Sequence, residues 1–536
     1  MRADRSVSWL QTLVAGLLSS SRRRWMVSFL FVTTLGALWG FANPPFAGPD
    51  EPAHVIRAHA LEHGQLTGNE PSRQTKRSEE QQVLVVRAPR IYRSATGTLC
   101  FPFHRDTSAS CEKFSGSTRD TNVATSSARH PPAYYGVVGV ASWLFRPGAA
   151  VVYLMRFIGA LIMGALVATA ITALRRAPTP RLVAAGVLLA VTPMTLFVSG
   201  IVNPSVSEIA ASLTLWVAGL VLVSGSHEQL DKRMITVVGI AGCVLALSRQ
   251  LGPLWLGLIA LTLLCMTSKR LLVNLARSNW ARFWGALIVA SAFAQVAWDV
   301  IAKPLEVPPQ GPQRTHFGAA EVLRNTFGAT WGRALEMIGS FGWLDTPSPA
   351  LTWVPWIAAV GFVILLAVSW ARRRDVVILI ALLIAVIAVP ALLESARYED
   401  SGGYFWQGRY TLPLAVGIPI LATIALASTE YGRQLATRRF MFAIGAVVSV
   451  AHVLAFAQNL RRYTVGYDGE IQYWRHAAWS PPVSSLLLTI AYTIVVIGFV
   501  WWVFASSTPV DRISFAGSVQ HMPHAERAEI TVESRG

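Results

Sequence analysis

The sequence predicts an all-α, polytopic membrane protein with about twelve transmembrane helices, and three observations support this fold class. First, 53% of the 536 residues are hydrophobic and only 14% are charged, whereas ordinary soluble proteins contain about 25% charged residues. Second, the chain repeatedly shows apolar stretches of about 17 to 25 residues, the length that crosses about 30 Å of hydrocarbon. Third, short basic clusters separate these stretches. An array of soluble domains is therefore excluded.

Six basic clusters set the expected topology. They are Arg22 to Arg24, Arg175/Arg176/Arg181, Lys232/Arg233, Lys269/Arg270 with Arg277 and Arg282, Arg372 to Arg374, and Arg433/Arg438/Arg439. Short basic loops stay in the cytoplasm, so placing all six inside gives spans at 25–43, 149–174, 182–199, 206–224, 234–250, 252–267, 283–301, 351–370, 376–393, 411–428, 440–457 and 483–505. Because anchoring accounts for the net charge of +17, we expect no nucleic-acid partner.

This topology divides the chain into three parts. They are a cytoplasmic N-terminus at 1–24, a transmembrane domain at 25–505 and a polar, disordered cytoplasmic tail at 506–536. The segments that face outward are 44–148, 302–350, 394–410 and 458–482. Residues 133–145 are apolar but too short to span, so we expect an interfacial or re-entrant helix in the first outer loop. The first span could also be a signal peptide, since small residues follow it, but its length favours an uncleaved helix.

Four cysteines fall into two pairs. Cys100 and Cys111 lie in the first outer loop, where an oxidising compartment permits a disulfide between them. Cys243 and Cys265 lie inside helices and are expected to be small buried residues. No spacing of the CxxC type indicates a metal site.

The sharpest motif follows the first span directly and reads NPPFAGPDEPAHVIRA from residue 43 to 58. Pro52 suits the first position of a helix, which puts Glu51 at or near the N-cap and Asp50 just before it. The helix dipole favours ionised carboxylates there. His54 and Arg57 share a face, so an acid, an imidazole and a guanidinium converge at the membrane surface. The alternative is a capped interfacial helix whose charges only face water.

Two further outer motifs gather polar and aromatic residues. Asp345 lies in FGWLDTP at 341–347, just before the eighth span, and Gln407, Arg409 and Tyr410 lie in QGRYTLP at 407–413, which opens the tenth. An Arg at the mouth of a membrane helix can hold a phosphate through its fixed fork of donors. It can equally be an anchor that extends toward water.

Charged residues inside spans are ambiguous. Asn203 lies in the turn 199–205, which leads to Glu208, one turn into the fourth span. A carboxylate costs about 2.5 to 3.5 kcal/mol at mid-bilayer and less near the interface, so Glu208 is either functional or close to water. Arg156 and Asp299 present the same choice. Because no nucleotide-binding signature is present, we expect no nucleotide cofactor and a donor reached from the outer leaflet.

Five blocks together resemble a bacterial family of polytopic membrane proteins that is similar in layout to the GT-C superfamily of glycosyltransferases, which use lipid-linked sugars. The blocks are PPxxxPDEPxH from Pro44 with its extension to Arg57, HPPxYY from His130, Asn203-Pro204, FGWLDTxxP from Phe341 and QGRYxxP from Gln407. In GT-C enzymes an acidic motif follows helix one, and Asp50 and Glu51 match it. Ser205 stands where a second acid is expected, so Glu208 is a possible substitute and a two-carboxylate metal site is in doubt.

The resemblance implies an inverting GT-C-type hexosyl- or pentosyltransferase of polysaccharide biosynthesis. It would move a sugar from a polyprenyl-phosphate donor to a hydroxyl of a cell-envelope glycan or glycoconjugate, on the extracytoplasmic face of the bacterial inner membrane. Asp50 is expected to be the general base, supported by Glu51. The expected substrate-binding residues are His54, Arg57, His130, Tyr134, Asn203, Glu208, Asp345, Gln407, Arg409 and Tyr410. A divalent cation, Mg²⁺ or Mn²⁺, is a further expectation, with Glu51 and His54 as candidate ligands.

A transporter or flippase of a lipid-linked or anionic solute is the alternative function. Twelve spans suit that class, but transporters concentrate their functional polar residues near the bilayer midplane. Here the densest cluster lies on one outer face, which favours the transferase. A glycan polymerase or a noncatalytic assembly partner is a third possibility.

Overall fold

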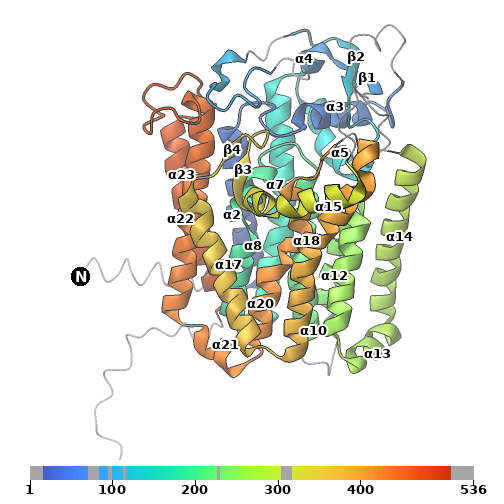
Figure 1. Cartoon of the computed structure of the whole chain (residues 1–536), viewed down its shortest axis with the longest axis vertical. Coiled ribbons are helices and arrows are strands. Elements are labelled where there is room, and N and C mark those ends of the chain that lie inside the picture. Colours follow the sequence, from blue (N-terminus) through green and yellow to red (C-terminus); the bar gives the residue numbers. More distant parts are fainter. Residues whose placement is uncertain are drawn as a thin grey trace, which may run out of the picture.

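The computed structural model describes residues 16–70, 84–93, 99–112, 116–225, 230–303, 317–401 and 403–508. Long helices stand side by side as a bundle, and short helices and small sheets gather at one end of it (Figure 1). The bundle helices are α2 (Ser21–Ala42), α7 (Ala149–Ala173), α8 (Pro180–Ala190), α9 (Pro193–Ser199), α10 (Ser205–Ser224), α11 (Lys232–Ser248), α12 (Gly252–Met266), α14 (Asn279–Ala302), α17 (Ala350–Trp370), α18 (Arg373–Ser401), α19 (Gly408–Ala415), α20 (Gly417–Ala427), α22 (Arg438–Val465) and α23 (Ser485–Ser506).

Shorter elements connect or cover the bundle. The helices are α3 (Glu51–Glu62), α4 (Arg90–Arg93), α5 (Pro132–Gly139), α6 (Ala141–Leu144), α13 (Lys269–Arg277), α15 (Ala319–Gly328), α16 (Thr330–Gly339) and α21 (Glu430–Leu435), with 3-10 turns η2 (Ala109–Cys111) and η3 (Leu174–Arg176). The strands are β1 (Leu84–Pro89), β2 (Asp120–Thr125), β3 (Ser340–Phe341) and β4 (Thr346–Pro347).

The all-α polytopic fold class is confirmed. Within the described residues, nine spans are long and apolar enough to cross a membrane, with α19 and α20 counted as one. The number is ten if α8 and α9, bent by 64° at a short break, form one span. Helices α11 and α12 occupy the two remaining predicted spans but are shorter, at 17 and 15 residues. Each of the twelve predicted spans therefore contains a helix or a bent pair, in rough agreement with the expected number.

The centre and the edge of the bundle differ in burial. Helix α10 and the α19–α20 pair are 89% buried over their most apolar window, whereas α14 is 17% buried. Helix α2 packs along α7 and α23, and α10 packs against α7 and α11. The N-terminal ends of α10 and α19, which carry predicted site residues, therefore start from the most rigidly packed part of the molecule.

The first outer loop contains structure that the sequence did not indicate. Strands β1 and β2 pair antiparallel from Leu84↔Thr125 to Pro89↔Asp120, with Val86 and Val123 buried. The pairing satisfies backbone groups within a segment too polar to join the bundle. A disulfide joins Cys100 and Cys111, whose Cα atoms are 6.1 Å apart.

Other loop predictions have mixed outcomes. Helices α5 and α6 lie where an interfacial or re-entrant helix was predicted at 133–145. Of the tail predicted to be disordered, residues 509–536 lie outside the described residues, as do residues 1–15 of the N-terminus. Helices α13 and α21, which belong to basic clusters, lie at the opposite end of the bundle from α3, β1 and β2 (Figure 1). The separation of basic clusters and outer loops fits a multi-pass membrane protein.

Candidate functional site

The site begins where the chain leaves α2 and turns into α3. Asp50 has φ 61°, in the left-handed region, and is the N-cap of α3, while Glu51 is the first helical residue. The sequence had placed Glu51 at or near the cap, so the helix begins one residue earlier than Pro52 indicated. The Asp50 side chain makes no capping hydrogen bond. Its carboxylate is therefore free to face away from the backbone.

Glu51 is held in a network that we call the Glu51 clamp, formed by Glu51, Arg156 and the backbone around them. Arg156 Nε and Nη2 donate to the two carboxylate oxygens at 2.8 and 2.7 Å. The backbone N–H groups of Val202 and Gly48 donate to the same oxygens. Arg156 also donates to the carbonyls of residues 40, 43 and 44. Because both side chains are buried and paired, Glu51 holds the motif against α7.

Asp50 has a different environment. Its side chain is 47% exposed and lies 3.3 Å from Arg409 Nη2, whereas the Arg409 side chain is only 2% exposed. Nη2 also donates to Tyr410 Oη at 3.3 Å. Within the described residues, Nε and Nη1 of Arg409 are buried without a hydrogen-bond partner. Unpaired buried donors are costly, so this guanidinium is well prepared to receive an anion. Its burial also argues against an anchor that extends toward water.

A second arginine, which the sequence analysis missed, lies close to the first. Arg249 is the C-cap of α11, and its Nη1 donates to Ser205 Oγ at 2.8 Å and pairs with Glu208 at 3.6 Å. The Cζ atoms of Arg249 and Arg409 lie 4.6 and 5.0 Å from the ring centre of Tyr410. One signal could have found Arg249, namely a single basic residue at the outward end of an apolar span with no basic neighbour. We call Asp50, Arg249, Arg409 and Tyr410 the Asp50 site.

Histidines and tyrosines line the same region. Tyr135 Oη lies 2.7 Å from His54 Nδ1 and 3.1 Å from His130 Nδ1. Burial, followed by the nearby charges of His130, Arg249 and Arg409, holds the pKa of His54 well below 6.5. Burial, followed by Arg249 and Arg57, lowers the pKa of His130 to about 3. Both rings are therefore neutral at neutral pH, which limits the positive charge around the two arginines.

The remaining predicted residues support the site from outside. Arg57 donates to the carbonyls of Gln65, Leu66 and His130, so it ties α3 to these loops. Asp345 pairs with Arg462 at 3.2 Å and accepts from the Phe103 N–H, which ties the first outer loop to α22.

Three more predicted residues belong to the frame of the site. Asn203 Oδ1 accepts from the Ser205 N–H at the start of α10, and Gln407 is the N-cap of α19. Tyr134 is buried in α5, close to the backbone of Asn203. Asn203 thus caps the start of α10, whereas the Gln407 side chain makes no capping hydrogen bond and lies two residues before Arg409 in the chain.

A divalent cation does not fit the predicted pair of ligands. Both oxygens of Glu51 are engaged by Arg156 and backbone N–H groups, and His54 faces Tyr135 and Ser127. In the part of the chain that the structure describes, no three His, Cys, Asp or Glu side chains are grouped to hold a metal ion. The positive charge in the Asp50 site comes from arginine.

An apolar groove of about 470 Å³ lies beside the site. Its walls come from α3, the start of α5, the end of α11 and α14. Two of the lining residues lie close to the site in the sequence. Pro131 directly follows His130, and Leu247 lies two residues before Arg249. Trp298, another lining residue, donates to the Arg129 carbonyl at 3.0 Å. The groove therefore lies between α14 and the chain segments that carry His130 and Arg249.

Fold and site together define a polytopic membrane protein with a charged site at one end of its helix bundle. The chain belongs to the family described as "Predicted membrane protein (DUF2142)", whose model matches residues 31–418. It is also similar to crystal structures of ArnT from Cupriavidus metallidurans. The apo structure has 14% identity and a TM-score of 0.41 over 91% of this chain and 77% of that one.

The structure of the same ArnT bound to undecaprenyl phosphate has 15% identity and a TM-score of 0.39, over 90% of this chain and 76% of that one. No curated protein matches the chain.

Proposed function

We propose that this protein is an inverting membrane glycosyltransferase that moves a hexosyl or pentosyl group from a polyprenyl phosphate to a hydroxyl of a cell-envelope glycan or glycoconjugate. The reaction takes place on the extracytoplasmic face of the cell membrane. One observation carries the proposal: a half-exposed carboxylate, Asp50, contacts a buried arginine, Arg409, two of whose donor nitrogens have no partner among the described residues. Such a pair offers a proton acceptor and an anion site within one small space.

Each group has a separate task in the transfer. The acceptor hydroxyl attacks the anomeric carbon while Asp50 takes its proton, and the bond from that carbon to the phosphate oxygen breaks. The leaving polyprenyl phosphate gains negative charge, which the guanidinium of Arg409 and, beside it, that of Arg249 offset. The apolar groove beside His130 receives the polyprenyl chain. No metal is needed to complete this scheme, because arginine supplies the positive charge.

Neutral histidines suit this assignment. His54 and His130 lie behind the arginines and share the Tyr135 hydroxyl. If either were protonated, it would attract the Asp50 carboxylate away from the acceptor hydroxyl and repel the arginines. Their lowered pKa values keep the two arginines as the main positive charges of the site.

One observation favours the alternative, a transporter. Helices α8 and α9 form a pair bent by 64°, and broken helices are common at transporter binding sites. The break at Val191–Thr192 is, however, occupied by protein contacts: Thr192 Oγ1 donates to the Met337 carbonyl, and the Val191 carbonyl contacts His452. The break is thus filled from within the protein, whereas Arg409 at the Asp50 site has two buried donor nitrogens without a partner among the described residues.

The test uses purified full-length protein in detergent with a synthetic short-chain polyprenyl-phosphate hexose or pentose and cell-envelope glycan. Release of polyprenyl phosphate that depends on the glycan supports the transferase. Asp50→Asn should lower this rate by about 100- to 10,000-fold, the usual cost of losing a general base, while donor binding persists. The matched control is Asp468→Asn, an exposed acid 3.4 Å from Arg105 in another outer segment. Full activity of Asp50→Asn, or solute movement that needs a gradient and no acceptor, would refute the proposal.

A further inference from the structure

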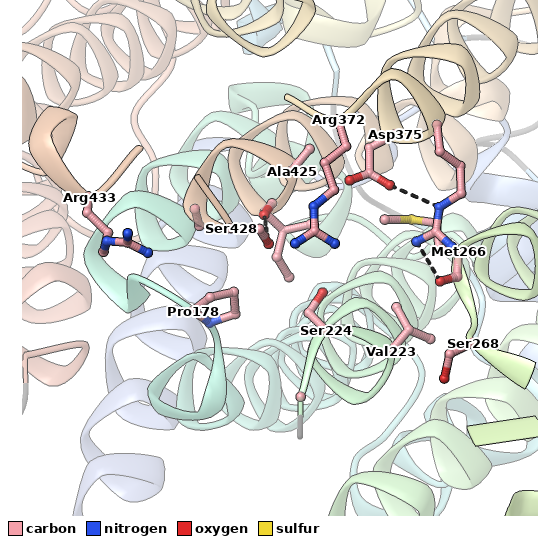
Figure 2. A pocket seen from close by; sticks show the side chains of 14 residues that line it. Pro178, Val223, Ser224, Met266, Ser268, Arg372, Asp375, Ala425, Ser428 and Arg433 are labelled. Carbon is pink, nitrogen blue, oxygen red and sulfur yellow. Dashed lines mark hydrogen bonds and ion pairs between the residues drawn. The ribbon is translucent and has the colours of Figure 1, made fainter. Parts of the chain in front are cut away.

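A polar cavity lies at the opposite end of the bundle from the Asp50 site, among the basic clusters. Its volume is about 490 Å³. Its walls come from five places in the chain: the turn before α8, the end of α10, the link from α12 to α13, the start of α18 and the end of α20 with α21. Figure 2 shows these walls and the side chains that line them. The proposed transferase reaction uses none of these residues.

Three arginines line this cavity, and they differ in the hydrogen bonds and ion pairs that their side chains make. Arg374 contacts Asp375 at 3.4 Å and donates to the Met266 carbonyl at 3.0 Å. Arg433 pairs with Glu430, one turn earlier on α21. Among the described residues, Arg372 has no hydrogen bond or ion pair from its side chain. The cavity therefore contains one uncompensated guanidinium beside two that are partly neutralised.

The geometry favours an anion over a cation or an apolar ligand. Figure 2 shows the Arg372 side chain reaching between the ends of α10 and α20, with its guanidinium near Ser224 and Ser428. The N-terminal ends of α13 and α18 also reach the cavity, at Ser268 and Arg374, and helix N-termini favour negative charge. Ser224, Ser268 and Ser428 also line the cavity, and a serine hydroxyl can donate to a phosphate oxygen.

We propose that this cavity binds a phosphate group at the basic face of the bundle, with Arg372 and Arg433 as its main contacts. An arginine fork matches phosphate oxygens in pairs, and the cavity is large enough for a phosphate with its neighbouring ester groups. Two sources share this chemistry, the headgroup of an anionic phospholipid and free phosphate. The site is distinct from the Asp50 site and does not depend on the proposed transfer reaction.

If these arginines only stabilise helix ends or set the membrane topology, mutations should have different effects. Helices α10 and α20 end at this cavity, and positively charged side chains near a helix C-terminus stabilise its last carbonyls. Basic loops also keep this face in the cytoplasm. Both roles depend on positive charge alone, so removing any arginine of this face should then have a similar effect. Specific phosphate binding requires the arginines that line the cavity.

The experiment measures retention of lipid by the purified full-length protein, using native mass spectrometry after exchange into mixtures of phosphatidylglycerol and phosphatidylcholine. The wild type should prefer phosphatidylglycerol. Arg372→Gln with Arg433→Gln should weaken that preference by about 100-fold, since two charge-assisted contacts of at least about tenfold each are lost. The matched control is Arg277→Gln with Arg439→Gln, two exposed arginines of the same basic face that do not line the cavity. The control should keep the wild-type preference.

A second arm separates the two sources. If inorganic phosphate alone raises the melting temperature of the wild type and displaces the lipid, free phosphate is the ligand. If only phosphatidylglycerol does so, the ligand is the lipid headgroup. Arg372→Lys keeps the charge and therefore the topology, yet should weaken binding, because lysine lacks the fork. An equal loss in the control pair, or equal retention of both lipids by the wild type, would overturn the proposal.

Discussion

The Glu51 clamp and the Asp50 site are built from neighbouring carboxylates, and each contains an arginine from a distant helix. In the clamp, both side chains are buried and every carboxylate oxygen is satisfied by Arg156 or by backbone N–H groups. At the Asp50 site the acid is half exposed, and Arg409 retains two unpaired nitrogens. A fully satisfied pair holds a fold in place, whereas a partly satisfied pair can still bind something else. Residue type alone therefore does not tell a buried, fully paired acid from an exposed, partly paired one.

The largest expected effect comes from breaking the clamp. Glu51→Gln leaves the Arg156 guanidinium buried without its negative partner, and removal of one member of a buried pair costs about 3 to 5 kcal/mol. We expect poor expression and a strongly lowered melting temperature in detergent. Glu51→Gln combined with Arg156→Met should recover part of the loss, because no uncompensated charge remains. If Glu51→Gln were as stable as the wild type but inactive, Glu51 would be a reactive residue and the comparison would fail.

The second prediction concerns the Asp50–Arg409 pair and uses Arg409→Lys. Lysine keeps the charge opposite Asp50 but loses the fork that we assign to the phosphate. Donor affinity should fall by roughly 10- to 100-fold, equivalent to the loss of one charge-assisted contact, with the melting temperature nearly unchanged. Titration with the polyprenyl-phosphate sugar measures the donor affinity. If the variant bound the donor as tightly as the wild type, Arg409 would be only an ion-pair partner of Asp50 and not a phosphate ligand.

Acidification should loosen the loop that carries both pairs. Burial lowers the pKa of His59 to about 4, and burial also holds the pKa of His54 well below 6.5. In the unfolded chain these histidines take up a proton near pH 6.5, whereas in the fold they stay neutral down to their lower folded pKa. The stability that the neutral rings provide is therefore complete above pH 6.5 and is lost as the pH falls toward the folded pKa. For His59, linkage gives roughly 2 kcal/mol between pH 6.5 and 5. Melting temperatures across this range measure it, and His59→Phe should flatten the profile. A flat wild-type profile would contradict the prediction.

The smallest change tests only where the Asp50 site faces. Thr67→Cys places an exposed thiol near the end of α3, and Gln434→Cys places one on α21 at the opposite end. In intact cells an impermeant thiol reagent should label the first and not the second, against the background of native Cys243 and Cys265. The reverse labelling pattern would show that the Asp50 site faces the cytoplasm, where the proposed cell-envelope acceptor is absent.

Much of the fold follows from local sequence. Apolar runs between basic clusters fix the positions of the helices, because charged groups are costly in hydrocarbon and backbone groups there must pair within a helix. The same local reasoning singled out the Asp50 and Glu51 motif and the block around Arg409. It did not show strands β1 and β2, whose pairing joins segments about 35 residues apart in a polar loop.

By itself, therefore, the sequence determined the helices, their approximate number and the connecting segments in which acids and arginines are concentrated. Only the tertiary structure decided which acid stays available. Arg156 meets Glu51 from 105 positions away, and Arg409 meets Asp50 from 359 positions away. Arg249 joins Tyr410 only because α11 and α19 both pack on α10. Pairing of this kind depends on the distance and burial of groups far apart in the chain, and neither quantity is contained in local periodicity.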